Sequence, residues 1–495
     1  MKNLKKILNV SQIREIDNYT IAKKSISSIE LMESAATSFV KALEKHDIAS
    51  KRILVVCGTG NNGGDGFAVC RLLRDKGFDS SAILVNFREP LSKDCNENIK
   101  RLQDVTILDA SSHLPDFSQY DIIIDAIFGS GLNSPVMGFV AKIINAINNA
   151  EKEVYSIDVP SGLSCDNISK SESIIKSAHV ISFQRPKLSF FFPENKTYIK
   201  SWEVADIGLS EHFIQEQESD YFVLDEDVSK CVKTRLRQSH KGTYGHALLM
   251  VGSYGKMGAA ILSSKACLRS GVGLLTSLVP KCGYEIMQIS VPESMCLTDE
   301  SKNILTTLPV IKNYNSIGIG PGIGQDALTA NMLKSLLEKS VQPLVLDADA
   351  INIISANNEL VKLLPNNTIL TPHIKEFDRL VGESQNTPER HMKQQDFCKQ
   401  HNCIIVLKDA YTCVSSAEGK LYFNTSGNQG MATGGSGDVL TGIITGLLAQ
   451  KYEPLQAAII GVHFHGKAGD QAVKSRSYSS LIASDIIENL QIERY

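Results

Sequence analysis

The sequence has almost no net charge, because 51 basic residues nearly balance 54 acidic ones and leave −3. Such a balance provides no global field that would attract nucleic acid or an anionic membrane surface. No stretch approaches the roughly 20 consecutive apolar residues that a membrane-spanning helix needs. Residues 1–17 also contain no apolar run long enough for a signal peptide. We therefore expect a soluble protein without nucleic-acid or membrane partners.

The 11 cysteines form no C-x-x-C pair and no His/Cys cluster with the spacing of a zinc site. Cys57 and Cys403 lie within or beside apolar runs, and Cys267 lies in a helix-like stretch, so we expect small core residues. An odd number of cysteines without a disulfide framework is typical of a reducing compartment. The sequence therefore predicts a cytoplasmic location.

A chain of 495 residues predicts two or three domains. The first half alternates short apolar runs with helix-like segments, which predicts a Rossmann-like open sheet with strands at 52–57, 81–86, 121–125, 154–158 and 179–183. The sequence turns polar between residues 211 and 236, so we place the boundary near residues 215 to 225. We expect domains at 1–215 and 225–495. The second is also α/β, with strands at 245–252, 316–320, 343–347 and 403–408.

A glycine-rich loop, residues 58–66, joins the first strand to a helix. Its glycines let the backbone approach a ligand, and the helix N-terminus offers free N–H groups. The side-chain oxygens of Asn61, Asn62 and Asp65 favour a hydroxylated ligand or a hard cation. The alternative is a tight turn in which Asn and Asp cap the following helix.

Polar residues also follow the later strands of the first domain: Asp125, the loop 129–135, and the segment 158–162 that begins with Asp158. The carboxyl ends of parallel strands converge on one crevice, so we expect these residues to meet there. Taken singly, each could equally be a cap or turn residue.

The strongest signal in the second domain is the segment 427–438, GNQGMATGGSGD, which leads into an apolar helix. Residues 433–437 can present successive N–H groups to a phosphate at the positive helix end. Asp438 then lies in the first turn, where it could accept a hydroxyl proton as a phosphoryl group arrives. The alternative is a glycine-rich connection in which Asp438 only favours the helix start.

Three further segments of the second domain fit a ligand site. The glycines of 318–324 allow close ligand approach, residues 371–376 place His373 three residues before Glu376, and Lys408 ends a buried strand where phosphate could be met. Taken alone, His373 could be structural and Lys408 an ordinary surface lysine.

In the first domain, the motifs NNGGDGF, DAIFGSGL and IDVPSGL, with SQIREIDNYT and SSIELME near the start, resemble the epimerase domain of the NAD(P)H-hydrate repair enzymes over residues 9 to 215. The resemblance implies interconversion of the R and S hydrates of NADH and NADPH. It implies that Asp158 contacts the substrate and that Asn62, Asp125 and Ser161 hold a potassium ion. Because epimerisation needs proton transfer or transient loss and return of water, a positioned carboxylate could act as base and acid, and our candidates are Asp158 first and Asp65 second. The implied hydrate-binding residues are Asn61, Asn62, Gly63, Gly64, Asp65, Gly129, Ser130, Gly131, Leu132, Asn133, Ser134, Pro135 and Asp158.

In the second domain, GMATGGSGDVL and the segments above resemble the ADP- or ATP-dependent dehydratase domain of the same enzymes, of ribokinase-like fold, over residues 225 to 495. The resemblance implies phosphorylation of the S hydrate at its ring hydroxyl, loss of phosphate, and Asp438 as the catalytic residue. It implies hydrate contacts at Ala259, Gly322, His373 and Asp438, and nucleotide contacts at Lys408, Asp409, Ala410, Tyr411, Thr412 and Gly437. Glu376 could hold magnesium through water.

The chain departs from the family pattern twice. Residues 408–412 read KDAYT where the family commonly has KGAxT, which adds the negative charge of Asp409 near the nucleotide. Residues 371–376 read TPHIKE where TPHPGE is common, which keeps His373 and Glu376 but changes the turn.

Two other functions remain open on sequence grounds. A ribokinase-like small-molecule kinase with a ligand-sensing first domain would release a stable phosphorylated alcohol, whereas the repair enzyme would release NADH and free phosphate. A non-catalytic scaffold is disfavoured by the intact Asp438 and glycine loop. The sequence does not choose between ADP and ATP, and we expect a homo-oligomer.

Overall fold

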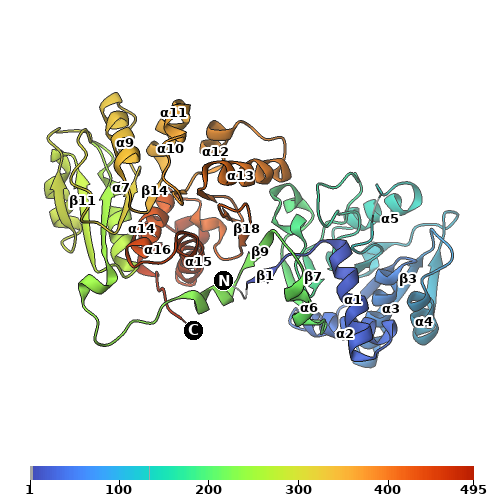
Figure 1. Ribbon diagram of the computed structural model, residues 1–495. Helices are drawn as coiled ribbons and strands as arrows, with labels where there is room; N and C mark the ends of the chain where they lie inside the picture. Colours follow the sequence, from blue (N-terminus) through green and yellow to red (C-terminus); the bar gives the residue numbers. More distant parts are fainter. Residues whose placement is uncertain (1–3, 133, 495) are drawn as a thin grey trace. The chain divides into compact units, whose positions relative to one another are not determined.

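The computed structural model describes residues 4–132 and 134–494, which form two compact units (Figure 1). The N-terminal unit is Lys6–Ser219, and the C-terminal unit contains residues 220–494 together with Leu4 and Lys5. Sequence analysis had grouped residues 4 and 5 with the first domain. The Leu4 side chain is nevertheless buried in the core of the C-terminal unit.

The N-terminal unit contains a seven-stranded parallel sheet with the order β4-β3-β2-β5-β6-β7-β8. The chain leaves β2 toward β3 and β4 and then returns to the other side of β2 at β5, so the carboxyl ends of β2 and β5 flank a topological switch point. This order confirms the Rossmann-like prediction. The strands are β2 (Ile53–Cys57), β3 (Ser80–Val85), β4 (Val105–Leu108), β5 (Ile122–Ala126), β6 (Glu153–Ile157), β7 (His179–Phe183) and β8 (Trp202–Ala205).

Helices cover both faces of this sheet, because alternate strand residues point to opposite sides. Val55 and Cys57 of β2 pack with α2 and α3, whereas Leu54 and Val56 pack with α5. The helices are α1 (Val10–Lys24), α2 (Ser28–Leu43), α3 (Asn61–Asp75), α4 (Lys93–Leu102), α5 (Gly138–Asn149) and α6 (Glu211–Glu216).

The C-terminal unit contains an eleven-stranded sheet with the order β1-β9-β18-β17-β16-β15-β14-β13-β10-β11-β12. The strands from β16 through β12 pair in parallel, whereas β17 is antiparallel to β16 and to β18. The strands are β1 (Lys5–Lys6), β9 (Tyr221–Leu224), β10 (His246–Met250), β11 (Leu274–Val279), β12 (Met295–Thr298), β13 (Ser316–Ile319), β14 (Leu344–Leu346), β15 (Ile369–Leu370), β16 (Ile404–Leu407), β17 (Cys413–Ser415) and β18 (Leu421–Asn424).

Two hydrophobic clusters sandwich this sheet. Helices α14 and α15 pack on one face against residues such as Val345 and Val406, and α9 and α10 pack on the other against Leu344 and Ile317. In Figure 1, α14 to α16 lie together below α9 to α13 within this unit. The helices are α7 (Met257–Arg269), α8 (Tyr284–Ser290), α9 (Ala327–Lys339), α10 (Ala348–Ala356), α11 (Asn358–Val361), α12 (Ile374–Val381), α13 (Thr387–His401), α14 (Ser436–Ala449), α15 (Pro454–Ala472) and α16 (Ala483–Glu488).

Short 3₁₀ turns connect several elements, at Phe117–Gln119, Leu188–Phe191, Pro193–Thr197, Glu226–Cys231, Lys241–Tyr244, Lys281–Gly283, Gln429–Met431 and Tyr478–Ser480. Within the described part of the chain, no helix combines the length and the apolar character needed to cross a membrane. The strand order, the mainly parallel pairing and the helices on both sheet faces make each unit an α/β fold, as the strand pattern predicts.

Candidate active sites

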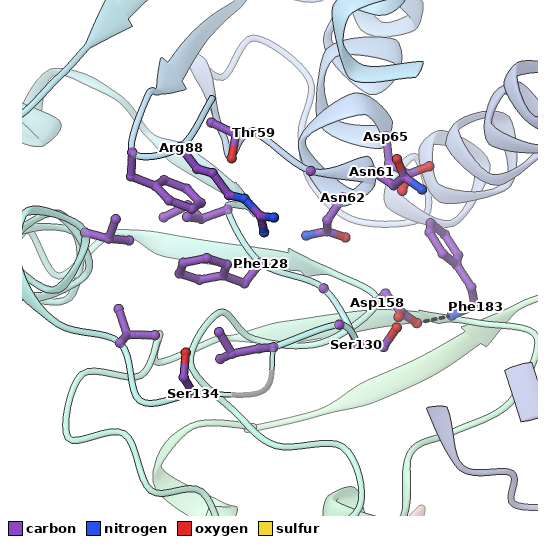
Figure 2. Close-up of a pocket in the computed structure, with 18 of the residues that line it drawn as sticks. Thr59, Asn61, Asn62, Asp65, Arg88, Phe128, Ser130, Ser134, Asp158 and Phe183 are labelled. Atoms are coloured by element: carbon purple, nitrogen blue, oxygen red, sulfur yellow. Dashed lines mark hydrogen bonds between the residues drawn. The ribbon is translucent and has the colours of Figure 1, made fainter. Parts of the chain in front are cut away.

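The N-terminal unit has a cavity of about 980 Å³ at the carboxyl ends of β2, β5 and β6. Figure 2 shows Asn62, Arg88 and Asp158 directed into the same space. Sequence analysis had expected the loops that follow these strands to meet in one crevice, and the structure brings them together there. The expected residues that line the cavity are Asn61, Asn62, Asp65, Gly129, Ser130, Gly131, Leu132, Ser134, Pro135 and Asp158.

Other expected residues lie away from the cavity lining. A Cβ on Gly63 would stand 1.9 Å from the Gly58 carbonyl oxygen, and one on Gly64 would stand 2.9 Å from Met32 Sδ. These two glycines therefore allow the first turn of α3 to pack against its neighbours. Asn133 lies outside the described residues.

Asp158 follows the last residue of β6 and forms a buried ion pair. Its Oδ1 lies 2.7 Å from Lys187 Nζ, and both side chains are almost completely buried. The same oxygen accepts hydrogen bonds from the Phe183 N–H at 3.1 Å and from Ser182 Oγ. The backbone of Asp158 is left-handed, with φ of 65°, an uncommon state that often marks a functional site in non-glycine residues. Lys187 and these hydrogen bonds therefore fix the position of the Asp158 carboxylate at the cavity wall.

Two more carboxyl groups face the same cavity. Burial, followed by the negative charge of Asp158, raises the pKa of Asp65 well above its usual range. Burial and the charge of Asp158 also raise the pKa of Asp17 to about 6, although Lys187 opposes this rise. The cavity thus holds a lysine-paired carboxyl group, Asp158, beside two carboxyl groups with raised pKa values, which is an arrangement suited to acid–base chemistry.

Aromatic and basic side chains complete the cavity. The rings of Phe87 and Phe128 lie 5.0 Å apart between centroids, and both line the cavity with Arg88. Flat rings can hold a planar heterocycle, and a guanidinium group can bind phosphate. Sequence analysis identified none of Asp17, Arg88 and Lys187. Asp17 lies in the motif SQIREIDNYT, which supported the family resemblance but was not used to choose site residues.

Asp125 and Ser161 lie beneath this surface and connect two of its loops. Asp125 is completely buried, and its carboxylate accepts hydrogen bonds from Ser156 Oγ at 2.9 Å, the Ser161 N–H at 2.8 Å, and Ser161 Oγ. Ser161 Oγ in turn accepts from the Phe128 N–H at 2.8 Å. Burial raises the pKa of Asp125, an effect that these hydrogen bonds oppose.

These residues fit a monovalent cation. Within the described part of the chain, no basic side chain hydrogen-bonds Asp125, so its buried charge has no cationic partner in the protein. The side chain of Asn62 lies against Gly129 in the neighbouring loop, and its amide oxygen Oδ1 is the atom that could bind such an ion. A carboxylate, a hydroxyl and an amide oxygen are the hard donors that such an ion prefers.

In the C-terminal unit, Asp438 lies in the first turn of α14, which begins after Gly435. Gly435 has a φ of 89°, a left-handed conformation that glycine adopts without strain. Burial, followed by the negative charge of Asp347, raises the pKa of Asp438 to about 7, although Lys408 opposes this rise. A carboxyl group with a pKa near neutrality is well suited to act as a general base.

Asp347 forms the centre of this second site. It follows the last residue of β14 and is almost fully buried. Its Oδ1 lies 2.9 Å from Lys408 Nζ, and its Oδ2 accepts a hydrogen bond from Thr441 Oγ1 of α14 at 2.7 Å. A Cβ on Gly437 would stand 3.1 Å from Lys408 Nζ, so the glycine turn lies directly on this pair. Sequence analysis did not single out Asp347, because its pairing with Lys408 spans two distant strands.

The expected hydrate-binding residues of this unit lie around the same centre. A Cβ on Gly322 would stand 3.1 Å from the Ala259 Cβ, so these two residues are neighbours. Asp349 accepts a hydrogen bond from the Gly324 N–H at 2.8 Å and lies 3.2 Å from Lys256 Nζ. The charge of Asp349 also contributes to the raised pKa of Asp438.

His373 is the N-cap residue of α12 and is held by Glu376. The His373 N–H donates to Glu376 Oε2 at 2.9 Å, and Glu376 Oε1 lies 3.5 Å from His373 Nε2. Both carboxylate oxygens thus lie close to His373, so Glu376 holds the start of α12 together. Backbone pairing of His373 with Lys408 brings the histidine beside the Asp347–Lys408 pair.

The expected nucleotide-binding segment forms the turn between β16 and β17. Asp409 and Ala410 are exposed, and Tyr411 and Thr412 are half-buried. The Asp409 carboxylate accepts a hydrogen bond from the Ala410 N–H at 2.7 Å. One carboxylate oxygen of Asp409 is therefore bound by the backbone of its own turn.

Comparison with known proteins assigns a separate family to each unit. The family model described as NAD(P)H-hydrate dehydratase matches residues 247–492, and the model for the N-terminus of YjeF-related proteins matches residues 28–189. The bifunctional NAD(P)H-hydrate repair enzyme of Moorella thermoacetica is 33% identical over 98% of this chain and 96% of its own length. The enzyme of the same description from Coxiella burnetii is 33% identical over 97% of this chain and 98% of its own length.

Solved structures are similar to the second unit, and one of them is a dehydratase. The ADP/ATP-dependent NAD(P)H-hydrate dehydratase from Bacillus subtilis, co-crystallised with ATP and Mg²⁺, is 29% identical, covers 54% of this chain and 95% of its own, and has a TM-score of 0.48.

We expect Lys187→Met to destabilise the N-terminal unit, because it leaves the buried Asp158 carboxylate without a partner. Breaking a buried ion pair by removing one member typically costs about 3–5 kcal/mol. Trp202, the one tryptophan in the sequence, lies in β8, so urea denaturation followed by tryptophan fluorescence reports on this unit.

The matched control is Lys76→Met, which breaks an ion pair of the same 2.7 Å length between exposed side chains. It should lower the free energy of unfolding by about 1 kcal/mol or less. The double variant Lys187→Met/Asp158→Asn should recover most of the loss. Equal effects of the two single variants would contradict the buried-pair interpretation.

Proposed function

Because the chain belongs to the family of bifunctional NAD(P)H-hydrate repair enzymes, we propose that its two units restore hydrated NADH and NADPH in two steps. The N-terminal unit interconverts the R and S hydrates. The C-terminal unit dehydrates the S form at the expense of ADP or ATP and releases phosphate. The main support is that relatives of this description align with nearly the whole chain, and that each unit carries a buried carboxylate site. This function is favoured over that of a simple small-molecule kinase.

For the first reaction, we assign the base to Asp158 and the proton donor to Asp65. Asp65 retains its proton because burial and neighbouring carboxylates raise its pKa. Its proton passes to the ring hydroxyl, the C–O bond breaks, and water leaves. Water then adds to the other face of the ring and gives a proton to Asp158, which Lys187 holds in the ionised form. Return of that proton to Asp65 completes the cycle, so no proton is consumed overall.

We further propose that Asn62, Asp125 and Ser161 hold a potassium ion. Such an ion would neutralise the buried charge of Asp125 and fix the two loops that Ser161 connects. Thermal unfolding followed by Trp202 fluorescence, in potassium and lithium salts of equal ionic strength, tests this assignment. Equal melting temperatures would contradict it.

For the second reaction, Asp438 acts as general base. It accepts the proton of the ring hydroxyl as the hydroxyl oxygen bonds to the terminal phosphorus of the nucleotide and the bond to the leaving nucleotide breaks. The N–H groups at the start of α14 and the Lys408 ammonium group face the transferred phosphoryl group. Phosphate then leaves with the electrons of the ring C–O bond, and loss of a proton from the neighbouring ring carbon restores the double bond.

The ligands assigned to this second site follow from the same proposal. Ala259, Gly322, His373 and Asp438 contact the hydrate, and residues 408–412 with Gly437 contact the nucleotide. Magnesium would arrive with the nucleotide phosphates, while Glu376 positions His373. The two donors, ADP and ATP, are distinguished by whether AMP or ADP accumulates during dehydration.

We also propose a homo-oligomer that works in the cytoplasm. The edge strand β12 and the adjacent α8 expose apolar side chains that could be covered by assembly: Tyr284, Ile286, Ile289, Met295 and Leu297. All 11 cysteines are free, which is compatible with a reducing compartment. Light scattering of the purified chain measures its mass, and a mass of one chain would contradict assembly.

The Asp158→Asn variant should repair only part of a mixed pool of R and S hydrates. Without the base, R-to-S conversion should slow by about 10²–10⁴-fold. The S form should still be dehydrated at the parental rate. Recovery of NADH absorbance, with saturating nucleotide, magnesium and potassium, measures both phases in one experiment.

The exposed Asp116→Asn variant is the matched control and should repair the whole pool. Full repair by Asp158→Asn at the parental rate would contradict the assignment of the base. Retained dehydration of the S form and unchanged Trp202 fluorescence show that the variant is folded.

The dehydration of S hydrate should become faster as the pH rises from about 6 to 8. Asp438 works as a base only when ionised, and its pKa is raised to about 7. The Asp347→Asn variant removes a neighbouring negative charge, so it should shift the midpoint of kcat/KM to lower pH. Asp438→Asn should lower the rate by about 10²–10⁴-fold at every pH.

The exposed Asp396→Asn variant is the control and should leave the profile unchanged. An undiminished rate in Asp438→Asn would refute the proposed base. An unshifted profile in Asp347→Asn would show that a different group controls the pH dependence.

A further inference from the structure

Two histidines and a glutamate meet at the end of the N-terminal sheet that lies opposite the cavity. His46 follows α2, His179 begins β7, and Glu203 lies in β8. The cavity residues Asp158 and Phe183 instead lie at the carboxyl ends of β6 and β7. We call His46, His179 and Glu203 the His-His-Glu cluster. The repair chemistry makes no use of it.

The three side chains aim their ligand atoms at one another. Glu203 Oε1 lies 3.6 Å from His46 Nε2 and 3.5 Å from His179 Nε2. One ligand atom from each residue lies within 4.8 Å of the others. Ligand atoms bound about 2.0–2.2 Å from a tetrahedral zinc ion lie about 3.3–3.5 Å from each other, so these separations are close to those of a metal site.

Hydrogen bonding determines which nitrogen of His179 carries the proton. Ser201 Oγ lies 2.7 Å from His179 Nδ1 and 3.0 Å from the carbonyl oxygen of Ala178. A hydroxyl has one hydrogen, and both contacts are satisfied only if Ser201 donates to the carbonyl and accepts from Nδ1–H. The neutral ring then presents the lone pair of Nε2 to the glutamate. A serine that holds the far nitrogen is also the support that metal-binding histidines commonly have.

Nε2 of His179 is therefore a buried acceptor that faces another acceptor. It is buried without a hydrogen-bond partner, and the atom opposite is a carboxylate oxygen. The other oxygen of Glu203, Oε2, is already bound by Lys45 Nζ at 2.7 Å, which leaves Oε1 for a second partner. A cation between Oε1 and the two imidazoles would satisfy all three groups at once.

We propose that the His-His-Glu cluster binds one divalent transition metal ion of the zinc type, with a fourth position open to water. Two imidazoles and a carboxylate form a ligand set that zinc accepts. The alternative occupant of the gap is a proton, which would make His179 a cation paired with Glu203. The metal-free chain distinguishes the two occupants, because only the proton makes His179 doubly protonated.

The metal would join segments that are far apart in the sequence. It would connect the end of α2 to the first residue of β7 and to β8, the edge strand of the sheet. The role we assign is therefore structural. Because the ligands share no short spacing in the sequence, a search for zinc motifs cannot find them.

The test is metal binding by the full chain after removal of metal with a chelator. Titration with Zn²⁺, followed by calorimetry, should show about one equivalent more in the parent than in His46→Gln or His179→Gln. His46 is the more exposed of the two histidines, so its substitution is the milder change for the fold. Binding of zinc by cysteines would be the same in parent and variants, and so cancels in this comparison.

Fluorescence of the one tryptophan gives a second measurement of metal binding. Trp202 precedes Glu203 in β8, so a paramagnetic ion such as Co²⁺ at the cluster should quench its fluorescence. The quenching should disappear in His46→Gln. Ser201→Ala keeps all three ligands and should weaken binding by about 10–100-fold, the usual effect of losing a supporting hydrogen bond.

The matched control is His212→Gln, because His212 is exposed and also lies near a glutamate, 3.4 Å from Glu216. It should bind zinc and respond to Co²⁺ as the parent does. The proposal is overturned if the parent and both cluster variants bind the same amount of zinc. It is also overturned if NMR of the metal-free chain shows a doubly protonated His179 at neutral pH. The hydrate-repair function would be unaffected by either result.

Discussion

Each unit contains a buried aspartate–lysine ion pair, and its aspartate lies at the carboxyl end of a parallel strand. Asp158 follows β6 and pairs with Lys187 at 2.7 Å, and Asp347 follows β14 and pairs with Lys408 at 2.9 Å. In both cases a lysine ammonium group directly contacts a carboxylate that is largely shielded from water. Burial, followed by the nearby carboxylate of the pair, raises the pKa of a second carboxyl group, Asp65 in one unit and Asp438 in the other. The acid–base properties of both sites depend on these pairs.

The sheets explain why such pairs can exist. Strand ends in a parallel sheet bring residues from distant parts of the chain to one edge, where backbone N–H groups and helix starts are also available. Phe183 contributes its N–H to Asp158, and Thr441 of α14 contributes its hydroxyl to Asp347. The charged groups are thus held by hydrogen bonds as well as by each other, as burial of an ion pair requires.

Sequence patterns predicted the features that depend on neighbouring residues. They missed the features that form between residues far apart in the sequence. The apolar runs predicted the central strands, and glycine-rich turns indicated Asp438 and the loops that line the N-terminal cavity. The edge strand β4 was missed because its alternation is weak and two of its four residues are exposed. Lys187 and Asp347 were also missed, because each acquires its role only through a partner that is distant in the sequence and follows another strand.

The glycine-rich motifs contain residues that face a ligand cavity and also glycines that only allow close packing. The sequence alone does not distinguish these two roles. Gly63 and Gly64 stand within the NNGGDGF motif beside Asn62, yet they face the protein interior while Asn62 and Asp65 face the cavity. A helix start explains the difference, because successive residues in its first turn point in different directions. Glu376 shows the same ambiguity, since a glutamate three residues after His373 can hold magnesium through water or close a helix cap. Here the His373 N–H donates to Glu376 Oε2, so the spacing serves the cap. Short motifs therefore locate a site reliably, but the direction of each side chain decides which of its residues take part in the chemistry.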